Sequence, residues 1–264
     1  MRKTPAEIIL QDLGITEPNE IDLEAIAWIQ GARIRYRKLE SCEARIIGHG
    51  DRAIITVNEQ SSPRRQRFSV AHELGHWKWH RGRLLVCRAD EIGNGDTSRP
   101  QIERTADEFA ADLLMPNYLF LPISGSFRKL TFKTVSEIAD TFDVSRTAAA
   151  IRLVETGHAP SLLVCHSYQG RKWFTRSPEV PKQWFPQDKL DAASFAFDVL
   201  FGDQPDDQIP RRMGADAWFD RWGADRFELM EQTIRTSKDQ VLTLLLVIDD
   251  EMLEERERFG TRSW

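Results

Sequence analysis

The segment Ser69-Val70-Ala71-His72-Glu73-Leu74-Gly75-His76-Trp77 decides how the rest of the chain is interpreted. On a helix, His72 and His76 are four residues apart, so both imidazoles project from one face and can bind one metal ion. Glu73 lies one position further round, where its carboxylate can take a proton from a water molecule beside the metal. His-Glu-x-x-His is the zinc-peptidase pattern, although a helix that merely carries two surface histidines can also contain it.

The flanking residues predict where this helix begins and which side of it is buried. Ser62 followed by Pro63 is typical of an N-cap and the first helical position. Apolar residues recur with helical spacing and predict a stripe that packs against a core; they are Val70, Leu74 and Trp77. Gly75 costs about 1 kcal/mol of helix propensity relative to alanine. It therefore indicates that a neighbouring strand or a substrate backbone approaches closely at that position.

Charge and cysteine usage restrict the class of protein. The 264 residues carry a net charge of −5, which does not indicate nucleic-acid binding by the chain as a whole. Basic residues gather around the motif, however, and predict either a solvated helix face or a surface that steers an acidic substrate; they are Arg64, Arg65, Arg67, Lys78, Arg81, Arg83 and Arg88. Cys42, Cys87 and Cys165 fit no metal or disulfide spacing and are typical of reduced cytosolic thiols. With no signal-like N-terminus and no apolar run near 18 residues, we expect a cytoplasmic protein without membrane spans.

The residues before the motif predict a short helix and three strands. The helix covers residues 21–28, and the strands cover 33–38, 44–47 and 53–58, with a turn at 48–51 between the last two. Peptidases of this class bind a substrate by adding it to an edge strand over the metal. Because the strand Ala53–Asn58 comes directly before the motif helix, we expect it to be that edge strand.

A second helix, from Gln101 to Met115, carries the candidate third ligand. A catalytic zinc site needs three protein ligands and one open position. Glu103 satisfies this if the two helices pack across each other, and Asp107, one turn later, can then accept the free ring N–H of a ligand histidine. The spacing alone equally fits an exposed acidic helix face that includes Glu108 and Asp112.

These two stretches together resemble the ImmA/IrrE family of metallopeptidases. Its pattern, R-F-[ST]-x-A-H-E-[LI]-G-H followed by E-x-x-A-[ND]-x-F-A-x-x-L-L-M-P, is matched by residues 67–76 and 103–116 at every metal or catalytic position. The resemblance spans residues 20 to 155. It implies that the metal ligands are His72, His76 and Glu103, with Glu73 as general base. It also implies a zincin-like fold and a divalent ion, with Zn2+ as default and Mn2+ or another ion as alternatives.

Residues 135–153 read as helix, tight turn and helix, with Ser145 capping the second helix. The segment resembles a helix-turn-helix, but its first helix is acidic, with Glu137, Asp140 and Asp143. Two helices that only pack within the peptidase lobe explain the pattern better than a DNA-binding element does. We therefore do not expect direct DNA binding.

Beyond residue 160 the pattern changes to that of a small α+β domain. The predicted strands cover residues 162–166, 172–175, 227–236 and 241–248, and a helix covers residues 188–201. Residues 249–257 are a short charged helix or a tail. We expect this domain to recruit a substrate or to sense a signal.

The sequence thus predicts an α+β protein with a zincin-like core of small sheet and helices at residues 1–116, a helix-turn-helix-like segment at 117–158 and an α+β domain at 159–264. We expect a cytosolic metalloendopeptidase that cleaves a helix-turn-helix repressor, because members of the resembling family characteristically derepress stress-response or mobile-element genes in this way. The alternatives are a DNA-binding regulator with a vestigial metal site and a peptidase partner in a toxin–antitoxin-like system. Candidates for the oxyanion-stabilising group are His80, Tyr118 and nearby arginines. The sequence does not identify the scissile bond, the activating signal or the oligomeric state.

Overall fold

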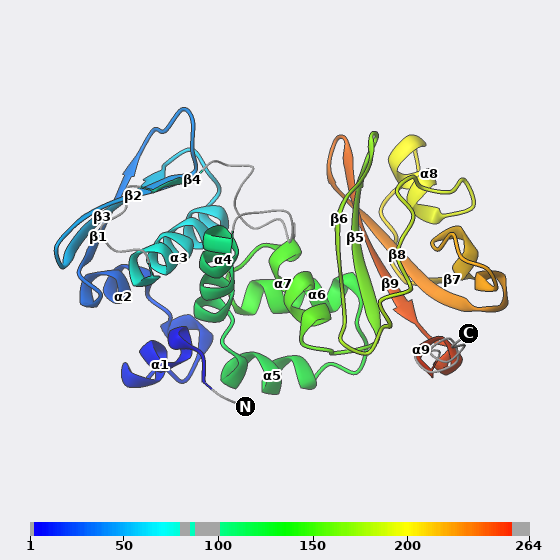
Figure 1. Cartoon of the computed structure of the whole chain (residues 1–264), viewed down its shortest axis with the longest axis horizontal. Helices are drawn as coiled ribbons and strands as arrows, with labels where there is room; N and C mark the ends of the chain where they lie inside the picture. Colours follow the sequence, from blue (N-terminus) through cyan, green and yellow to red (C-terminus); the bar gives the residue numbers. More distant parts are fainter. Residues whose placement is uncertain (1–2, 80–84, 88–100, 255–264) are drawn as a thin grey trace, which may run out of the picture. The chain divides into compact units, whose positions relative to one another are not determined.

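The computed structural model describes residues 3–79, 85–87 and 101–254, which fall into two compact units (Figure 1). The N-terminal unit comprises Met1–Ser124 and Glu137–Ala148, and the C-terminal unit comprises Gly125–Ser136 and Ala149–Trp264. Helices α6 (Phe132–Thr141) and α7 (Arg146–Glu155) therefore each contribute to both units. The three-part division at residues 116 and 158 stays a prediction.

The N-terminal unit is built on a four-stranded sheet in the order β1-β3-β2-β4. Its strands are β1 (Ala32–Arg37), β2 (Ala44–His49), β3 (Arg52–Asn58) and β4 (Leu85–Cys87). Strand β1 runs parallel to β3, whereas β2 is antiparallel to both β3 and β4. Alternate side chains on β2 and β3 are buried, namely Ala44, Ile46, Ala53, Ile55 and Val57. The sheet therefore has one buried face and one exposed face.

The prediction that the strand Ala53–Asn58 binds substrate as an edge strand is wrong. This strand, β3, pairs with β1 on one side and with β2 on the other. Its backbone N–H and C=O groups are used by both neighbours, so no further strand can pair with it. Within the part of the chain that the structure describes, the edges of this sheet are β1 and β4.

Besides the parts of α6 and α7, the described residues of the N-terminal unit contain five α-helices. They are α1 (Pro5–Asp12), α2 (Leu23–Ile29), α3 (Pro63–Trp79), α4 (Gln101–Leu114) and α5 (Asn117–Gly125). Helix α3 contacts β2 and β3, and a Cβ added at Gly48 on β2 would lie 2.3 Å from the Trp77 ring. Helix α5 begins directly after Pro116. This segment is helical because Leu119 and Phe120 are buried on one side of it.

Three arginines at the start of α3 are held in ion pairs inside the N-terminal unit. Arg64 pairs with Asp140 at 2.6 Å and with Asp143 at 3.3 Å, and Arg67 pairs with Asp143 at 3.4 Å. Arg65 lies 3.8 Å from Glu43. These arginines are therefore neither a purely solvated face nor a free steering surface. Their partners are Asp140 on α6, Asp143 just after it, and Glu43. Arg81, Arg83 and Arg88 lie outside the described residues.

The C-terminal unit contains a five-stranded antiparallel sheet in the order β6-β5-β9-β8-β7. Its strands are β5 (Ser161–Ser167), β6 (Gly170–Arg176), β7 (Arg211–Gly214), β8 (Glu228–Ser237) and β9 (Gln240–Val247). Four strands match the sequence prediction, and β7 was not predicted. The helices are α8 (Phe195–Phe201) and α9 (Asp250–Glu254). The mixed α+β fold predicted from the sequence is confirmed.

Helix α8 begins seven residues later than the predicted residue 188, and its N-terminus shows why. The Ser194 hydroxyl accepts a hydrogen bond from the Phe197 backbone N–H at 3.2 Å. Ser194 is therefore the N-cap, and the residues before it have the non-helical backbone that a cap requires. Helix α7 is capped as expected, because the Ser145 hydroxyl accepts from the Ala148 backbone N–H at 3.1 Å.

The thiols of Cys42 and Cys165 are free and buried, as expected for a reduced protein. Burial raises the pKa of the Cys165 thiol to about 11. None of the described helices combines the length and apolar character needed to cross a membrane.

A fully buried carboxyl group, Glu231, joins α8 to the sheet of the C-terminal unit. It accepts hydrogen bonds from the Ala196 backbone N–H at 2.6 Å and from the Trp218 indole N–H at 2.8 Å. The Thr233 hydroxyl donates to it at 3.1 Å. Burial raises the pKa of Glu231 to about 6, although these hydrogen bonds oppose the shift.

The Glu231 carboxyl should make the stability of the chain depend on pH. Its folded-state pKa lies above the ordinary value, so the stabilisation by its protonated form is complete below about pH 4.5 and is lost as the pH rises through 6. Relative to Glu231→Gln, the wild type should lose about 2 kcal/mol of unfolding free energy between pH 4.5 and 7. Urea unfolding followed by tryptophan fluorescence measures this difference, and a constant difference across the range would contradict it.

Candidate metal centre

The two histidines of the motif lie side by side on the buried face of α3. His72 is 0% and His76 is 1% exposed. Their rings meet edge to face with centroids 4.6 Å apart, and the two Nε2 atoms are 3.0 Å apart. Helical spacing of four residues therefore brings the two nitrogens to one point, as the sequence predicts.

Glu103 on α4 is the third group at this point. Its Oε2 atom lies 3.2 Å from His72 Nε2 and 3.5 Å from His76 Nε2. A tetrahedral zinc site with metal–ligand distances of about 2.0–2.1 Å separates its donor atoms by roughly 3.3 Å. The three residues therefore form a group able to hold a divalent metal. Their roles as ligands stay predictions.

The third group reaches the histidines because α3 and α4 cross very closely. A Cβ added at Gly75 would lie 3.0 Å from the Ala106 Cα and 3.1 Å from the Ala106 carbonyl oxygen. The sequence indicated a close approach at Gly75 by a strand or a substrate, whereas the neighbour is the backbone of α4. Ala106, which is 0% exposed, is the residue that the sequence did not single out. Its small side chain, facing a glycine, is the signal that could have identified the crossing.

Asp107 holds His72 in the orientation that the site requires. His72 Nδ1 lies 2.8 Å from Asp107 Oδ1, so the carboxylate can accept the ring N–H and leave Nε2 facing Glu103 and His76. Burial by itself would lower the pKa of His72, but the hydrogen bonds to Asp107 and Glu103 outweigh it and raise that pKa to about 9. Burial by itself would raise the pKa of Glu103. Hydrogen bonds from both histidines outweigh this effect and hold the pKa well below its usual range. The carboxylates of Asp107 and Glu103 therefore favour a positive charge at the position of the two histidines.

Glu73, the expected general base, is fully buried beside the histidines. Its charge contributes to raising the pKa of His72 and that of Cys42, so the carboxyl lies within electrostatic range of both side chains. The side chains of Glu103 and Asp107 retain 12% and 18% exposure, so the cluster opens to solvent on the α4 side. The catalytic role of Glu73 stays a prediction.

The structure reduces the candidates for the oxyanion-stabilising group. The Tyr118 hydroxyl donates to the Ile15 carbonyl at 2.8 Å, so it is engaged elsewhere in the unit. The α3 arginines that the structure describes are in ion pairs with Asp140, Asp143 and Glu43. His80 lies outside the described residues.

Replacing Glu103 should remove the metal. Glu103→Ala deletes one of three donors, so the divalent metal content of the purified chain should fall from about one equivalent to a small fraction. Glu108→Ala is the matched control, because Glu108 is exposed on the same helix. Elemental analysis after dialysis measures both variants. Full metal retention in Glu103→Ala would place the third ligand elsewhere.

Moving α3 and α4 apart should also weaken metal binding, although it changes none of the three predicted ligands. In Gly75→Val, the added atoms must displace the α4 backbone at Ala106, and Glu103 moves away with it. We expect metal affinity to fall about tenfold or more, as measured by competition with a chromophoric chelator. Gly125→Val is the control, since a Cβ at Gly125 meets nothing within 4 Å. Equal affinities in the two variants would show that the crossing does not position Glu103.

Comparison with known proteins identifies the domain that carries this centre. Residues 27–154 match the model of the IrrE N-terminal-like domain. The radiation response metalloprotease IrrE of Deinococcus deserti is 34% identical over 107 residues, which are 40% of this chain and 38% of that protein. Its counterpart from Deinococcus radiodurans is 29% identical over 107 residues, which are 40% of this chain and 32% of that protein. The matched part thus spans less than two fifths of either relative.

Among solved structures, a Mycobacterium tuberculosis transcriptional regulator is similar over 92% of this chain and 74% of that chain, with a TM-score of 0.58. Its sequence identity is 15%, so this likeness concerns the fold alone. The family model and the two relatives confirm the family predicted from the two motifs. Residues 27–154 of this chain are therefore similar to the IrrE N-terminal-like domain, as the two motifs predicted.

Proposed function

We propose that this chain is a metal-dependent endopeptidase, with zinc as its default ion, that cleaves a protein substrate in the cytoplasm. The observation that carries the proposal is the buried cluster of His72, His76 and Glu103 with Glu73 beside it. Two imidazoles and one carboxylate are the donors of catalytic zinc sites in peptidases, and they leave one position open. A purely structural zinc site has four protein ligands, whereas the described residues supply three donors here, which favours catalysis.

The residues around the cluster have distinct tasks in peptide hydrolysis. The ion, when bound, supplies Lewis-acid chemistry that makes a water molecule more acidic and polarises the substrate carbonyl. Glu73 takes a proton from the attacking water on a carboxylate oxygen and then delivers it to the nitrogen of the leaving amine. Asp107 keeps the Nδ1 proton of His72 in place, so that Nε2 keeps its lone pair for the metal. Burial of His72, His76 and Glu73 excludes bulk water and strengthens these interactions.

The substrate that we propose is a DNA-binding repressor, whose cleavage derepresses stress-response or mobile-element genes. Two considerations support it: the motif resemblance, and relatives that are named as radiation response metalloproteases. The alternative of a DNA-binding regulator with a vestigial metal site is less well supported, because the donor set is complete and the acidic residues Asp140 and Asp143 lie near where α6 ends. A peptidase partner in a toxin–antitoxin-like system would use the same chemistry on a different protein.

Glu73→Gln tests the chemistry without disturbing the metal. The amide keeps the shape of the side chain but cannot accept and deliver the proton. We expect metal content to stay within the error of the wild type and proteolysis to fall at least about 1,000-fold. Lysate of the source cells is incubated with either protein, and new protein N-termini are mapped by mass spectrometry.

The proposal expects N-termini that appear only with the wild type, within or near the helical regions of DNA-binding proteins. Cleavage that persists in Glu73→Gln would refute the mechanism. Wild-type-specific N-termini confined to other classes of protein would leave the peptidase in place and refute the repressor as substrate.

A further inference from the structure

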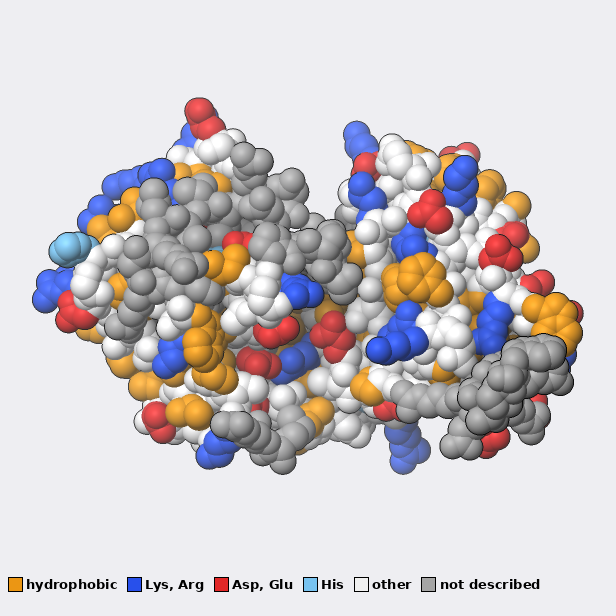
Figure 2. Space-filling view, in the orientation of Figure 1, with side chains coloured by type: hydrophobic (Ala, Val, Ile, Leu, Met, Phe, Trp, Pro, Cys, Tyr) orange, Lys and Arg blue, Asp and Glu red, His pale blue; other side chains and the backbone are white. Residues whose placement is uncertain are grey.

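The exposed face of the N-terminal sheet carries a dense patch of arginine side chains. Alternate positions on β1, β2 and β3 point away from α3, and the basic residues among them are Arg33, Arg35, Arg37, Arg45 and Arg52. All five are exposed, and Figure 2 shows Arg and Lys side chains gathered over this part of the unit. The three strands contain no Asp or Glu. A chain with a net charge of −5 thus concentrates positive charge on one surface.

The charge of these arginines is not neutralised within the fold. The ion pairs found among the described residues use Arg64, Arg65, Arg67, Arg211 and Arg212, together with the histidines, and include none of the five. This separates the sheet arginines from the arginines of α3, whose partners lie in their own unit. Unpaired guanidinium groups are suited to binding carboxylates from another molecule.

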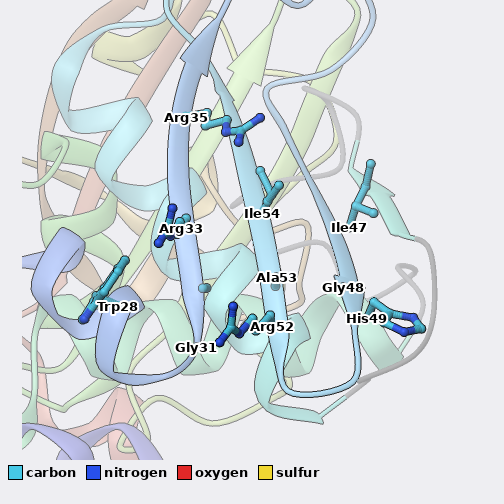
Figure 3. Close-up of a pocket in the computed structure, with 11 residues that line it drawn as sticks. Trp28, Gly31, Arg33, Arg35, Ile47, Gly48, His49, Arg52, Ala53 and Ile54 are labelled. Atoms are coloured by element: carbon cyan, nitrogen blue, oxygen red, sulfur yellow. The ribbon is translucent and has the colours of Figure 1, made fainter.

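The centre of the patch is an apolar groove of about 700 Å³ (Figure 3). Its lining includes Ile47 on β2, which is 52% exposed, and Ile54, which pairs with Ile47 from the neighbouring strand β3. Trp28, 61% exposed, closes one side, and the Arg33 guanidinium lies over its ring at 4.7 Å from the centroid. A second groove of about 420 Å³ continues past Trp28 along β1. An apolar centre with a basic rim is the anatomy of a protein-binding surface.

The composition of the groove distinguishes a protein partner from a nucleic acid. Single-stranded nucleic acid is held by aromatic rings on which successive bases stack. Here the centre is aliphatic, and the single exposed tryptophan of the groove already has Arg33 over its face. Isoleucines such as Ile47 and Ile54 instead match leucine-like or valine-like side chains of a polypeptide. The arginines around them match Asp and Glu.

We propose that this sheet face is a docking surface for an acidic polypeptide segment that also carries apolar side chains, and that the segment belongs to the protein substrate. The identity of the partner as substrate rests on the proposed function. The metal residues lie under the opposite face of the sheet, on and beside α3. Because the docking surface and the metal residues lie on opposite sides of the sheet, the arginines cannot take part in peptide hydrolysis. Their contacts with the substrate instead supply binding energy that positions it at the metal centre.

Peptide binding to the full chain tests the surface. The chain carries Glu73→Gln and is loaded with zinc, so that no probe is cleaved. The main probe is a fluorescein-labelled 14-residue peptide of alternating Glu and Leu. Its two counterparts replace Glu by Lys or Leu by Ser, and a 20-nucleotide single strand of thymidine represents nucleic acid. Fluorescence anisotropy measures binding at low salt, where surface charges are least screened.

We expect the Glu/Leu peptide to bind, the Lys/Leu peptide not to bind, and the Glu/Ser peptide to bind at least about tenfold more weakly. The double variant Arg35→Glu/Arg45→Glu should weaken the Glu/Leu peptide about tenfold or more. Arg128→Glu/Lys129→Glu is the matched control, because it makes the same charge change at exposed positions that belong to neither the sheet nor its unit. Metal content measured on both variants shows that the fold is retained.

Four outcomes would overturn the proposal. The Glu/Leu peptide could fail to bind or could bind both double variants equally. The Lys/Leu peptide could bind as well as the acidic one. The oligonucleotide could bind more tightly than the peptide and be lost in Arg35→Glu/Arg45→Glu, which would assign the surface to nucleic acid. Because the assay needs no cleavage, it separates failure of the docking surface from failure of the peptidase mechanism.

Discussion

The close crossing of α3 and α4 is the constraint on which the rest of the site depends. A zinc-type site needs donor atoms about 3.3 Å apart, and two of its three donors are fixed by the helical spacing of His72 and His76. The third, Glu103, comes from another helix and must be brought to the same point by packing. Gly75 and Ala106 allow this, because neither has a side chain that would hold the backbones apart. Gly75 lowers the helix propensity of α3, but it allows the close crossing that brings Glu103 to the two histidines.

Around that crossing, charge is arranged so that each group has a defined partner. Asp107 orients the His72 ring through its Nδ1 atom. At the start of α3, Arg64 forms an ion pair with Asp140 and Arg67 forms one with Asp143. Fixing both the beginning of α3 and the ring of His72 restricts the motion of the motif helix relative to α4. An active site needs donors that are positioned before the ligand arrives, since any reorganisation is subtracted from the binding energy.

The N-terminal sheet separates two surfaces with different tasks. Its inner face supports α3 through small and aliphatic side chains, whereas its outer face presents arginines around an apolar groove. The strict alternation of side chains along β2 and β3 lets one short sequence serve both surfaces. The proposed hydrolytic centre and the proposed docking surface can thus share a scaffold of three strands without competing for the same side chains.

The sequence by itself determined which residues to propose for the metal centre, since His72, Glu73 and His76 are related by local helix geometry and the pattern of Glu103 to Pro116 is similar to that of one family. It also predicted most strands, because alternation and turn residues act over a few positions. Only the tertiary structure decided what depends on contacts between distant segments. It made β3 an interior strand, paired the α3 arginines with Asp140, Asp143 and Glu43, and left the arginines of β1 outside the ion pairs found among the described residues. Local patterns record which residues are basic, but strand order and helix packing decide which of those charges meet an acid and which face solvent.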